Sequence, residues 1–261
     1  MDFGVLTYNI LADYLAVPNY IHVRDEKHLD SKKRMTLLLK YLRDQTKRVR
    51  FFFLQEVSPS QLVILVPFFR GHGFDHFAVG DLATFFPREV GIFRMQGGQI
   101  TDIMKGDDLG RFDPRRIRQY YSVIDLVWRE KPFRLVNSHL VSSPELEAAK
   151  LSQAKAIASA VLPSPRFPVI WGGDFNSTPD SRVYAFLSTK LRSVNPSEMF
   201  LTTHASNRGT PHFSETIDYI WFASPEFHCK EFIPPYTTPP VEYMPNGKQP
   251  SDHFPLVGIM E

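Results

Sequence analysis

Cysteine is nearly absent from this chain of 261 residues, which contains only Cys229. A disulfide within the chain is therefore excluded, and so is a zinc site built on several cysteines. Long apolar runs are also missing. Stretches such as Leu62–Phe69 fall far short of the roughly 20 residues that a membrane-spanning helix needs. We therefore expect a protein that has no membrane partner.

A strong excess of charge of one sign is missing as well. Lys and Arg number 30, Asp and Glu number 28, and the net charge is +2 with neutral histidines. This balance is compatible with a polyanionic partner but does not require one. With 43% hydrophobic and 22% charged residues, the composition is typical of a globular protein and excludes intrinsic disorder.

The residues that follow Met1 show neither the basic start nor the apolar core of a secretory signal peptide. The single cysteine is in keeping with a reducing compartment. We expect a cytoplasmic protein, or a mitochondrial or nuclear one if a targeting segment has been trimmed.

Strand-like and helix-like segments alternate along the chain, without an internal repeat. Met35, Leu38 and Leu42 recur at helical spacing and predict an amphipathic helix over Ser31–Asp44. The all-apolar run Phe51–Leu54 predicts a strand buried on both faces. Further helices are expected at Ser58–Phe69 and from Ser143 through Leu162, and further strands at Phe3–Tyr8, Glu89–Arg94, Ser122–Trp128, Phe133–His139, Pro168–Trp171, Thr216–Phe222 and Phe254–Met260.

This order predicts an α/β sandwich in which helices cover a core of two packed sheets. No linker-like break divides the chain, so we expect a single domain over residues 1–261. The proline-rich stretch Ile233–Pro250 is interpreted as an extended surface loop.

Polar side chains follow or begin several of these apolar strands. An unpaired buried carboxylate costs several kcal/mol, so such groups should be paired, hydrogen-bonded or bound to a metal. Oxygen ligands suit Mg²⁺ or Mn²⁺ better than zinc. If the strand ends converge, they form a site suited to metal-assisted phosphoester hydrolysis. The side chains are Asn9, Glu56, His139, Asp174, Asn176, Asp218, Asp252 and His253.

Six segments containing these residues resemble, in order, the motifs of the exonuclease–endonuclease–phosphatase superfamily. The start of the chain and the run Asp174–Ser181 are most similar to its deadenylase-type branch, which includes nocturnin, Angel proteins, carbon-catabolite-repressor deadenylases and a 2′-phosphodiesterase. The segments are Tyr8-Asn9-Ile10-Leu11, Leu54-Gln55-Glu56-Val57, Asn137-Ser138-His139-Leu140, Gly173-Asp174-Phe175-Asn176-Ser177, Ile217-Asp218-Tyr219-Ile220 and Ser251-Asp252-His253-Phe254-Pro255-Leu256.

The resemblance implies a four-layer α/β sandwich of two mixed β-sheets and a role for each matched residue. Glu56 corresponds to the main ligand of Mg²⁺ (or Mn²⁺), with Asp174, Asn176 and Asp252 as further metal contacts. Asp174, helped by Asn176, orients or deprotonates the attacking water. The remaining catalytic roles fall to His253 held by Asp218, to His139 on the phosphate, and to Asn9 in the water network.

Two further matches concern the base of the substrate. Pro144 lies five residues after His139, and Phe213 lies five residues before Asp218, as in the deadenylases, where such a pair holds the adenine. Each also has a simpler interpretation. Ser143-Pro144 is an ordinary helix start, and Phe213 is one of 22 phenylalanines.

The catalytic motifs have structural alternatives too. Asp174 and Asn176 are turn-forming residues, and a single histidine such as His253 is often structural. The basic run Arg111–Arg118 is either an RNA-backbone contact or a solvated face.

The pattern as a whole predicts a Mg²⁺-dependent 3′–5′ exoribonuclease of deadenylase type that acts on an A-rich, single-stranded RNA 3′ end and releases 5′-nucleotides. A phosphatase or 2′-linkage phosphodiesterase acting on nucleotides or RNA ends is the alternative within the same superfamily. A non-catalytic RNA-binding module is disfavoured, because every expected catalytic position is filled.

Overall fold

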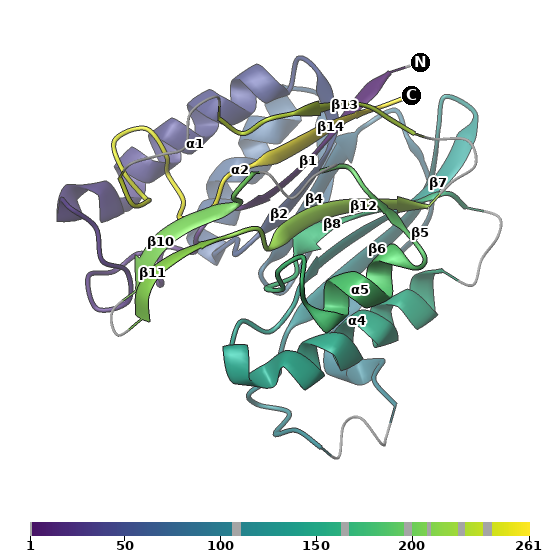
Figure 1. Cartoon of the computed structure of the whole chain (residues 1–261). Helices are drawn as coiled ribbons and strands as arrows, with labels where there is room; N and C mark the ends of the chain where they lie inside the picture. The colour runs from purple at the N-terminus through teal and green to yellow at the C-terminus, as the bar shows by residue number, and fades with distance from the viewer. Residues whose placement is uncertain are drawn as a thin grey trace.

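The computed structural model describes residues 2–105, 111–162, 167–195, 200–207, 210–223, 228–236 and 242–261. Within these ranges, two six-stranded β-sheets are stacked face to face, and helices cover their outer faces (Figure 1). The predicted four-layer α/β sandwich is confirmed. A third, smaller sheet is the hairpin of β10 (Thr203–Asn207) and β11 (Thr210–Glu215).

Both large sheets are mixed, with one parallel pair among antiparallel neighbours. Parallel strands end at the same edge of a sheet, and this places Asn9 opposite Gln55 in the first sheet and His139 opposite Asp174 in the second. In spatial order, the first sheet contains β13 (Cys229–Ile233), β14 (Leu256–Met260), β1 (Phe3–Asn9), β2 (Val49–Gln55), β4 (Leu82–Pro87) and β3 (Phe74–Val79). The second contains β5 (Gly91–Gln99), β6 (Tyr120–Trp128), β7 (Lys131–His139), β8 (Val169–Asp174), β12 (Asp218–Ala223) and β9 (Arg192–Ser193).

Strand β2 contributes side chains to two buried clusters, one on each face of its sheet. Phe51 and Phe53 belong to the cluster between the sheets, whereas Phe52 and Leu54 belong to the cluster under the helices. Successive side chains of a strand point to opposite faces, so an all-apolar run is buried on both. The predicted doubly buried strand is therefore confirmed.

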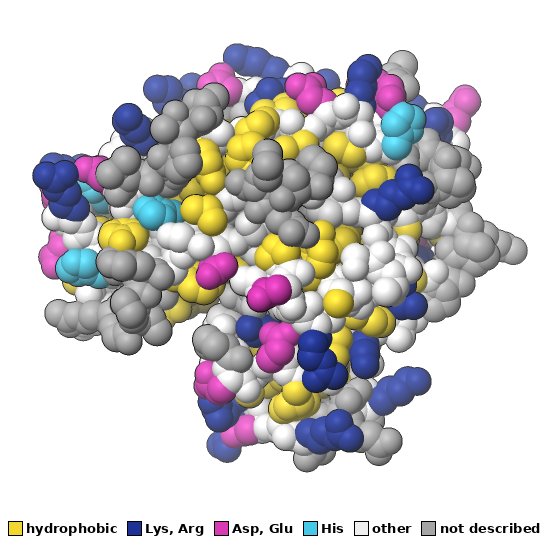
Figure 2. Space-filling model, in the orientation of Figure 1, with side chains coloured by type: hydrophobic (Ala, Val, Ile, Leu, Met, Phe, Trp, Pro, Cys, Tyr) yellow, Lys and Arg dark blue, Asp and Glu magenta, His cyan; other side chains and the backbone are white. Residues whose placement is uncertain are grey.

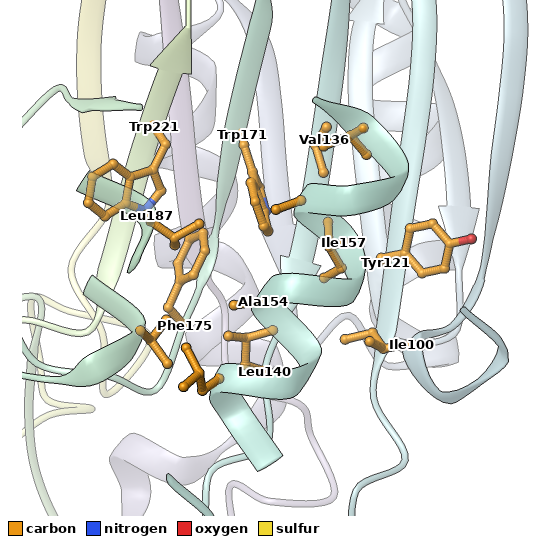
Figure 3. Packing of buried hydrophobic residues seen from close by; sticks show 14 of the residues in the cluster. Ile100, Tyr121, Val136, Leu140, Ala154, Ile157, Trp171, Phe175, Leu187 and Trp221 are labelled. Atoms are coloured by element: carbon orange, nitrogen blue, oxygen red, sulfur yellow. The ribbon is translucent and has the colours of Figure 1, made fainter. Parts of the chain in front are cut away.

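The helices cover the sheets in pairs. Helices α1 (Ser31–Gln45) and α2 (Pro59–Gly71) pack on the first sheet, and α4 (Glu147–Val161) and α5 (Arg182–Ser188) pack on the second. Helix α2 begins with a capping box between Ser58 and Gln61, which satisfies backbone N–H groups of its first turn. Figure 3 shows residues of α4 packed among side chains of the second sheet and its loops.

Some boundaries differ from the sequence-based expectation. The helix expected from Ser143 begins with a 3-10 turn, Pro144–Leu146, before α4. The hairpin of β3 and β4 was not predicted, since its first strand is only partly buried. Short 3-10 turns also cover Glu26–Leu29 and Ile100–Asp102.

Within the proline-rich stretch Ile233–Pro250, Ile233 ends β13, and the other described residues, 234–236 and 242–250, form no helix or strand. Met244 is fully buried, so the predicted surface loop does not run along the surface throughout. None of the helices in the described ranges has the length and apolar character needed to cross a bilayer.

The close approach of the two sheets makes Gly172 a sensitive position for stability. A Cβ atom at Gly172 would lie 2.4 Å from Cδ2 of Phe53 in the other sheet. We expect Gly172→Ala to lower the free energy of unfolding by about 1–3 kcal/mol, as overpacking does elsewhere. Gly71→Ala is the control, because its Cβ would meet no atom within 4 Å. Urea denaturation of both variants checks this; equal stabilities would contradict it.

Candidate active site

The amide of Asn9 joins the two sheets at the edge where their strands end. Its Nδ2 donates hydrogen bonds to Glu56 Oε1 at 2.9 Å and to Asp174 Oδ2 at 3.0 Å. Asn9 is fully buried at the end of β1, Glu56 follows β2, and Asp174 ends β8. One side chain thus fixes a carboxylate from each sheet.

Two imidazole–carboxylate pairs face Asp174. His253 Nδ1 lies 2.8 Å from Asp218 Oδ2, and His139 Nδ1 lies 3.2 Å from Asp81 Oδ2. The Nε2 atom of each histidine is 3.7 Å from Asp174 Oδ2. Both rings therefore present Nε2 to the same carboxylate, His139 from the end of β7 and His253 from the loop before β14.

These contacts favour charged imidazoles. Burial alone would lower the pKa of His139, but the hydrogen bond to Asp81 and the charges of Asp174 and Glu56 outweigh it and raise the pKa to about 9. Burial also opposes the charge of His253, yet Asp218 beside it holds that pKa well above its usual value.

The carboxylates show the opposite tendency. Burial raises the pKa of Asp218 to about 6, even though the adjacent His253 favours its charged form. Burial also raises the pKa of Glu56, with Asp252 adding to the effect and His139 opposing it. The site therefore concentrates more negative charge than its two imidazoles compensate.

The buried carboxylates of the site fit a hard metal ion. Ligand atoms of Asp174, Asp218 and His253 all lie within 4.8 Å of one another, and the three residues are buried. Within the described residues, Asp218 Oδ1 is buried without a hydrogen-bond partner. Carboxylate oxygens held close together without enough cations are the environment in which a divalent cation binds favourably.

The expected metal ligands occupy different places around this cluster. Glu56 and Asp174 share the amide of Asn9. Asp252 is half-buried, and its Oδ1 lies 3.3 Å from the Ser251 hydroxyl that donates to it. Asn176 directs its Nδ2 toward the Leu140 carbonyl at 2.8 Å, and its backbone N–H donates to Asp174 Oδ1 at 2.9 Å.

A surface cleft of about 420 Å³ lies beside Asn176. Its lining includes Phe213, with an exposed fraction of 38%, and the buried Lys150.

Pro144 begins the 3-10 turn after β7, but its side chain lies outside the described residues. On the face shown in Figure 2, several acidic side chains border a hollow above the part of the surface formed by α4 and α5.

Three residues that support the site were missed by sequence reasoning. Asp81, the partner of His139, lies in the turn of the β3–β4 hairpin, where Gly80 has a φ of +59°. A Gly-Asp pair is a recognised hairpin signal, so this residue could have been found. Lys150 donates from Nζ to the Asn176 carbonyl at 2.7 Å. The third residue is Arg34.

Arg34 ties together the two loops that border the site. It is buried, and it donates to the carbonyl oxygens of Ile10, Leu11 and Pro250. Nothing in the local sequence signals these contacts, since Pro250 is 216 positions away.

The basic run Arg111–Arg118 contains paired arginines as well as a buried apolar residue. Arg115 pairs with Asp113 at 3.1 Å and Arg116 with Glu145 at 3.0 Å, so two of the four arginines have acidic partners at the surface. Ile117 is buried in the core beside them. Residues 106–110 before the run lie outside the described ranges.

The sequence is similar to those of known proteins. The chain is 31% identical to Carbon catabolite repressor protein 4 homolog 4 of Arabidopsis thaliana over 159 residues, which cover 48% of this chain and 38% of that protein. It is 23% identical to the CCR4-Not complex 3′-5′-exoribonuclease subunit Ccr4 of Candida albicans over 332 aligned positions, 98% of this chain and 40% of that protein. The chain thus spans about two fifths of these relatives' length.

The fold also has close structural counterparts. The crystal structure of ANGEL2, a 2′,3′-cyclic phosphatase, in complex with adenosine-2′,3′-vanadate superposes with a TM-score of 0.79 at 19% identity, covering 100% of this chain and 95% of that one. A family model described as Endonuclease/Exonuclease/phosphatase family matches residues 6–253, which include all eight polar residues of the strand ends. The chain belongs to the Endonuclease/Exonuclease/phosphatase family.

Proposed function

We propose that this protein is a Mg²⁺-dependent 3′–5′ exoribonuclease that removes nucleotides from A-rich RNA 3′ ends. One observation carries the proposal. Asp174 is held by Asn9, faces two imidazoles, and lies two residues from Asn176, which lines the cleft containing Phe213. The imidazoles would face a bound phosphate group, and Phe213 in the neighbouring cleft would offer a ring for the adjoining base to stack on.

The metal would be held by Glu56 and Asp174, with Asp252 and Asn176 as further contacts. When bound, Mg²⁺ supplies positive charge that polarises the phosphate and favours the ionised form of water. The chain's own residues provide the rest of the chemistry.

Asp174 accepts the proton of the attacking water, whose oxygen forms the new bond to phosphorus. The bond from phosphorus to the O3′ atom of the preceding nucleotide breaks, and O3′ takes up a proton from solvent. His139 and His253, both charged, face the negative charge that develops on the phosphate oxygens. Asp81 and Asp218 orient these rings through Nδ1, which leaves each Nε2 to the substrate.

A phosphatase or 2′-linkage phosphodiesterase is the second candidate. The observation that favours it is the full-length superposition on ANGEL2, a 2′,3′-cyclic phosphatase. The same catalytic residues would serve both reactions, and only the surroundings of the phosphate would differ. The Candida relative, which is named as a 3′-5′-exoribonuclease subunit, supports the exoribonuclease instead.

The substrate assay compares 5′-labelled RNAs ending in A or in U, each with Mg²⁺ or with EDTA. We expect a metal-dependent ladder that shortens from the 3′ end, faster on the A-ended RNA. RNAs ending in a 2′,3′-cyclic phosphate and 2′–5′-linked oligomers are tested in parallel. Turnover of these without any ladder would reject the exoribonuclease and select the second candidate.

Replacement of the central carboxylate tests the assignment of the site. We expect Asp174→Ala to lower kcat by about 10³-fold or more, because proton transfer and metal binding are lost together. Asp44→Ala is the control, since Asp44 is an exposed carboxylate on α1 that pairs with Lys47. Circular dichroism should show both variants folded. Wild-type turnover by Asp174→Ala would refute the assignment.

The pKa of His139 predicts the upper limb of the pH–rate profile. The charged ring is present below its pKa of about 9, so activity should fall as the pH rises through that value. Asp81→Asn removes the partner that does most to raise the pKa of His139. The pH at which activity falls should therefore shift down toward the ordinary histidine value of about 6.5. Asp75→Asn, at an exposed position on the same hairpin, should leave it in place.

The same shift affects stability. A histidine pKa raised on folding stabilises the folded chain fully below about pH 6.5, and this contribution is lost as the pH rises through about 9. Its size is on the order of 3 kcal/mol. Urea denaturation without divalent metal at pH 6 and pH 9.5 tests this, because wild type should lose more stability between the two pH values than Asp81→Asn does. An identical change in both proteins would contradict the role of Asp81.

A further inference from the structure

The segment that follows β1 presents three large, exposed apolar side chains. Tyr14 has an exposed fraction of 62%, Tyr20 of 43% and Val17 of 37%. In the described part of the chain, neither tyrosine ring stacks on another aromatic ring. Large exposed aromatic surfaces carry a cost in water, which points to a binding role.

These rings do not belong to a loose loop. Leu11, Ala16 and Ile21 of the same segment are buried in a small cluster of their own. The N–H of Ala12 donates to Glu56 Oε2 at 3.2 Å. The segment is therefore anchored to the core on one side and to the candidate metal ligand on the other.

Asp13 adds a further anchor directly beside Tyr14. Its carboxylate accepts a hydrogen bond from Ser60 Oγ at 2.8 Å and lies 3.6 Å from Arg34 Nη1. The backbone next to Tyr14 is thus held to α2 and to the buried arginine. A ring on such a support is presented to a ligand at little entropic cost.

Both tyrosines lie near carboxylates of the candidate site. Partial burial raises the pKa of Tyr14, and the charges of Asp81 and Glu56 add to this effect. Partial burial also raises the pKa of Tyr20, with Glu56 and Asp252 contributing. The hydroxyls therefore stay neutral, so the rings add no charge that would repel a phosphate chain.

The position of the rings complements that of Phe213. The cleft with Phe213 and Asn176 is built largely from loops that follow strands of the second sheet. Tyr14 and Tyr20 follow β1 of the first sheet, and the carboxylates lie where the ends of the two sheets meet. A strand with its scissile phosphate at Asp174 would place its terminal base toward Phe213 and the preceding nucleotide toward the tyrosines.

We propose that Tyr14 and Tyr20 form a stacking subsite for the base of the nucleotide on the 5′ side of the scissile phosphate in single-stranded RNA. This inference rests on the proposed exoribonuclease function. The subsite holds the nucleotide whose O3′ leaves, whereas Phe213 contacts the nucleotide that is released. Stacking on ring faces tolerates any base, so this subsite contributes affinity without selecting sequence.

The test uses the full chain, Mg²⁺ and two RNA oligomers that differ only in the penultimate nucleotide, which is adenosine in one and an abasic ribose in the other. We expect wild type to lose about 10-fold in kcat/KM on the abasic RNA, within the range of about 5- to 150-fold typical of one stacked base. The double variant Tyr14→Ala, Tyr20→Ala should lose a similar factor on the adenosine RNA and nothing further on the abasic one.

Two controls separate stacking from other effects. The double variant Tyr14→Phe, Tyr20→Phe keeps the ring faces and should behave as wild type. Phe93→Ala removes an equally exposed ring on β5, at 64% exposure, and should leave both substrates unaffected. Fluorescence anisotropy with 5′-fluorescein-labelled oligo(A) in EDTA measures binding without turnover and should show the same losses.

The outcomes distinguish the subsite from the function on which it rests. Wild type that shortens RNA with equal efficiency on both oligomers would overturn the subsite and leave the exoribonuclease intact. An alanine double variant that keeps the full penalty for the abasic RNA would do the same. Wild type that shortens neither RNA would overturn both.

Discussion

The fold brings several carboxylates together where the ends of the two sheets meet, and their mutual repulsion must be offset by hydrogen bonds and by positive charge. Glu56 and Asp174 come from different sheets and share the single amide of Asn9. Asp81 and Asp218 are each balanced by an imidazole. These contacts compensate only part of the negative charge, and the remainder makes a divalent cation a natural component of the site.

The backbone is strained where it meets this requirement. Leu11, Glu56 and Asn176 have φ values of 57°, 55° and 47°, a region that costs a non-glycine residue about 1–2 kcal/mol. Each follows a strand that ends at the site. Positive φ turns the chain sharply there, so that the side chain or N–H of the residue faces the cluster. Arg34 and Lys150 hold the strained segments through backbone carbonyls.

The sequence was informative where a local pattern determines structure. The run Phe51–Leu54 predicted a doubly buried strand because alternation along a strand needs no knowledge of its neighbours. The candidate residues of the site were proposed on a different ground, the resemblance of six ordered motifs to a known family. Asp81 escaped because its hairpin mixes polar and apolar residues. Arg34 escaped because its partners are far away in the chain, and only the packed fold brings them together.

In the proposed function, the chemistry and the recognition of substrate belong to different parts of the molecule. The candidate catalytic side chains lie at the ends of core strands, where a shift would disturb both sheets. The rings that could meet a base, those of Phe213 on β11 and of Tyr14 and Tyr20 after β1, are exposed and belong to none of the buried clusters. One protein similar in sequence is named as an exoribonuclease subunit, and one similar in fold is named as a cyclic phosphatase. We expect the choice of substrate by this protein to depend on these aromatic residues rather than on the carboxylates and imidazoles.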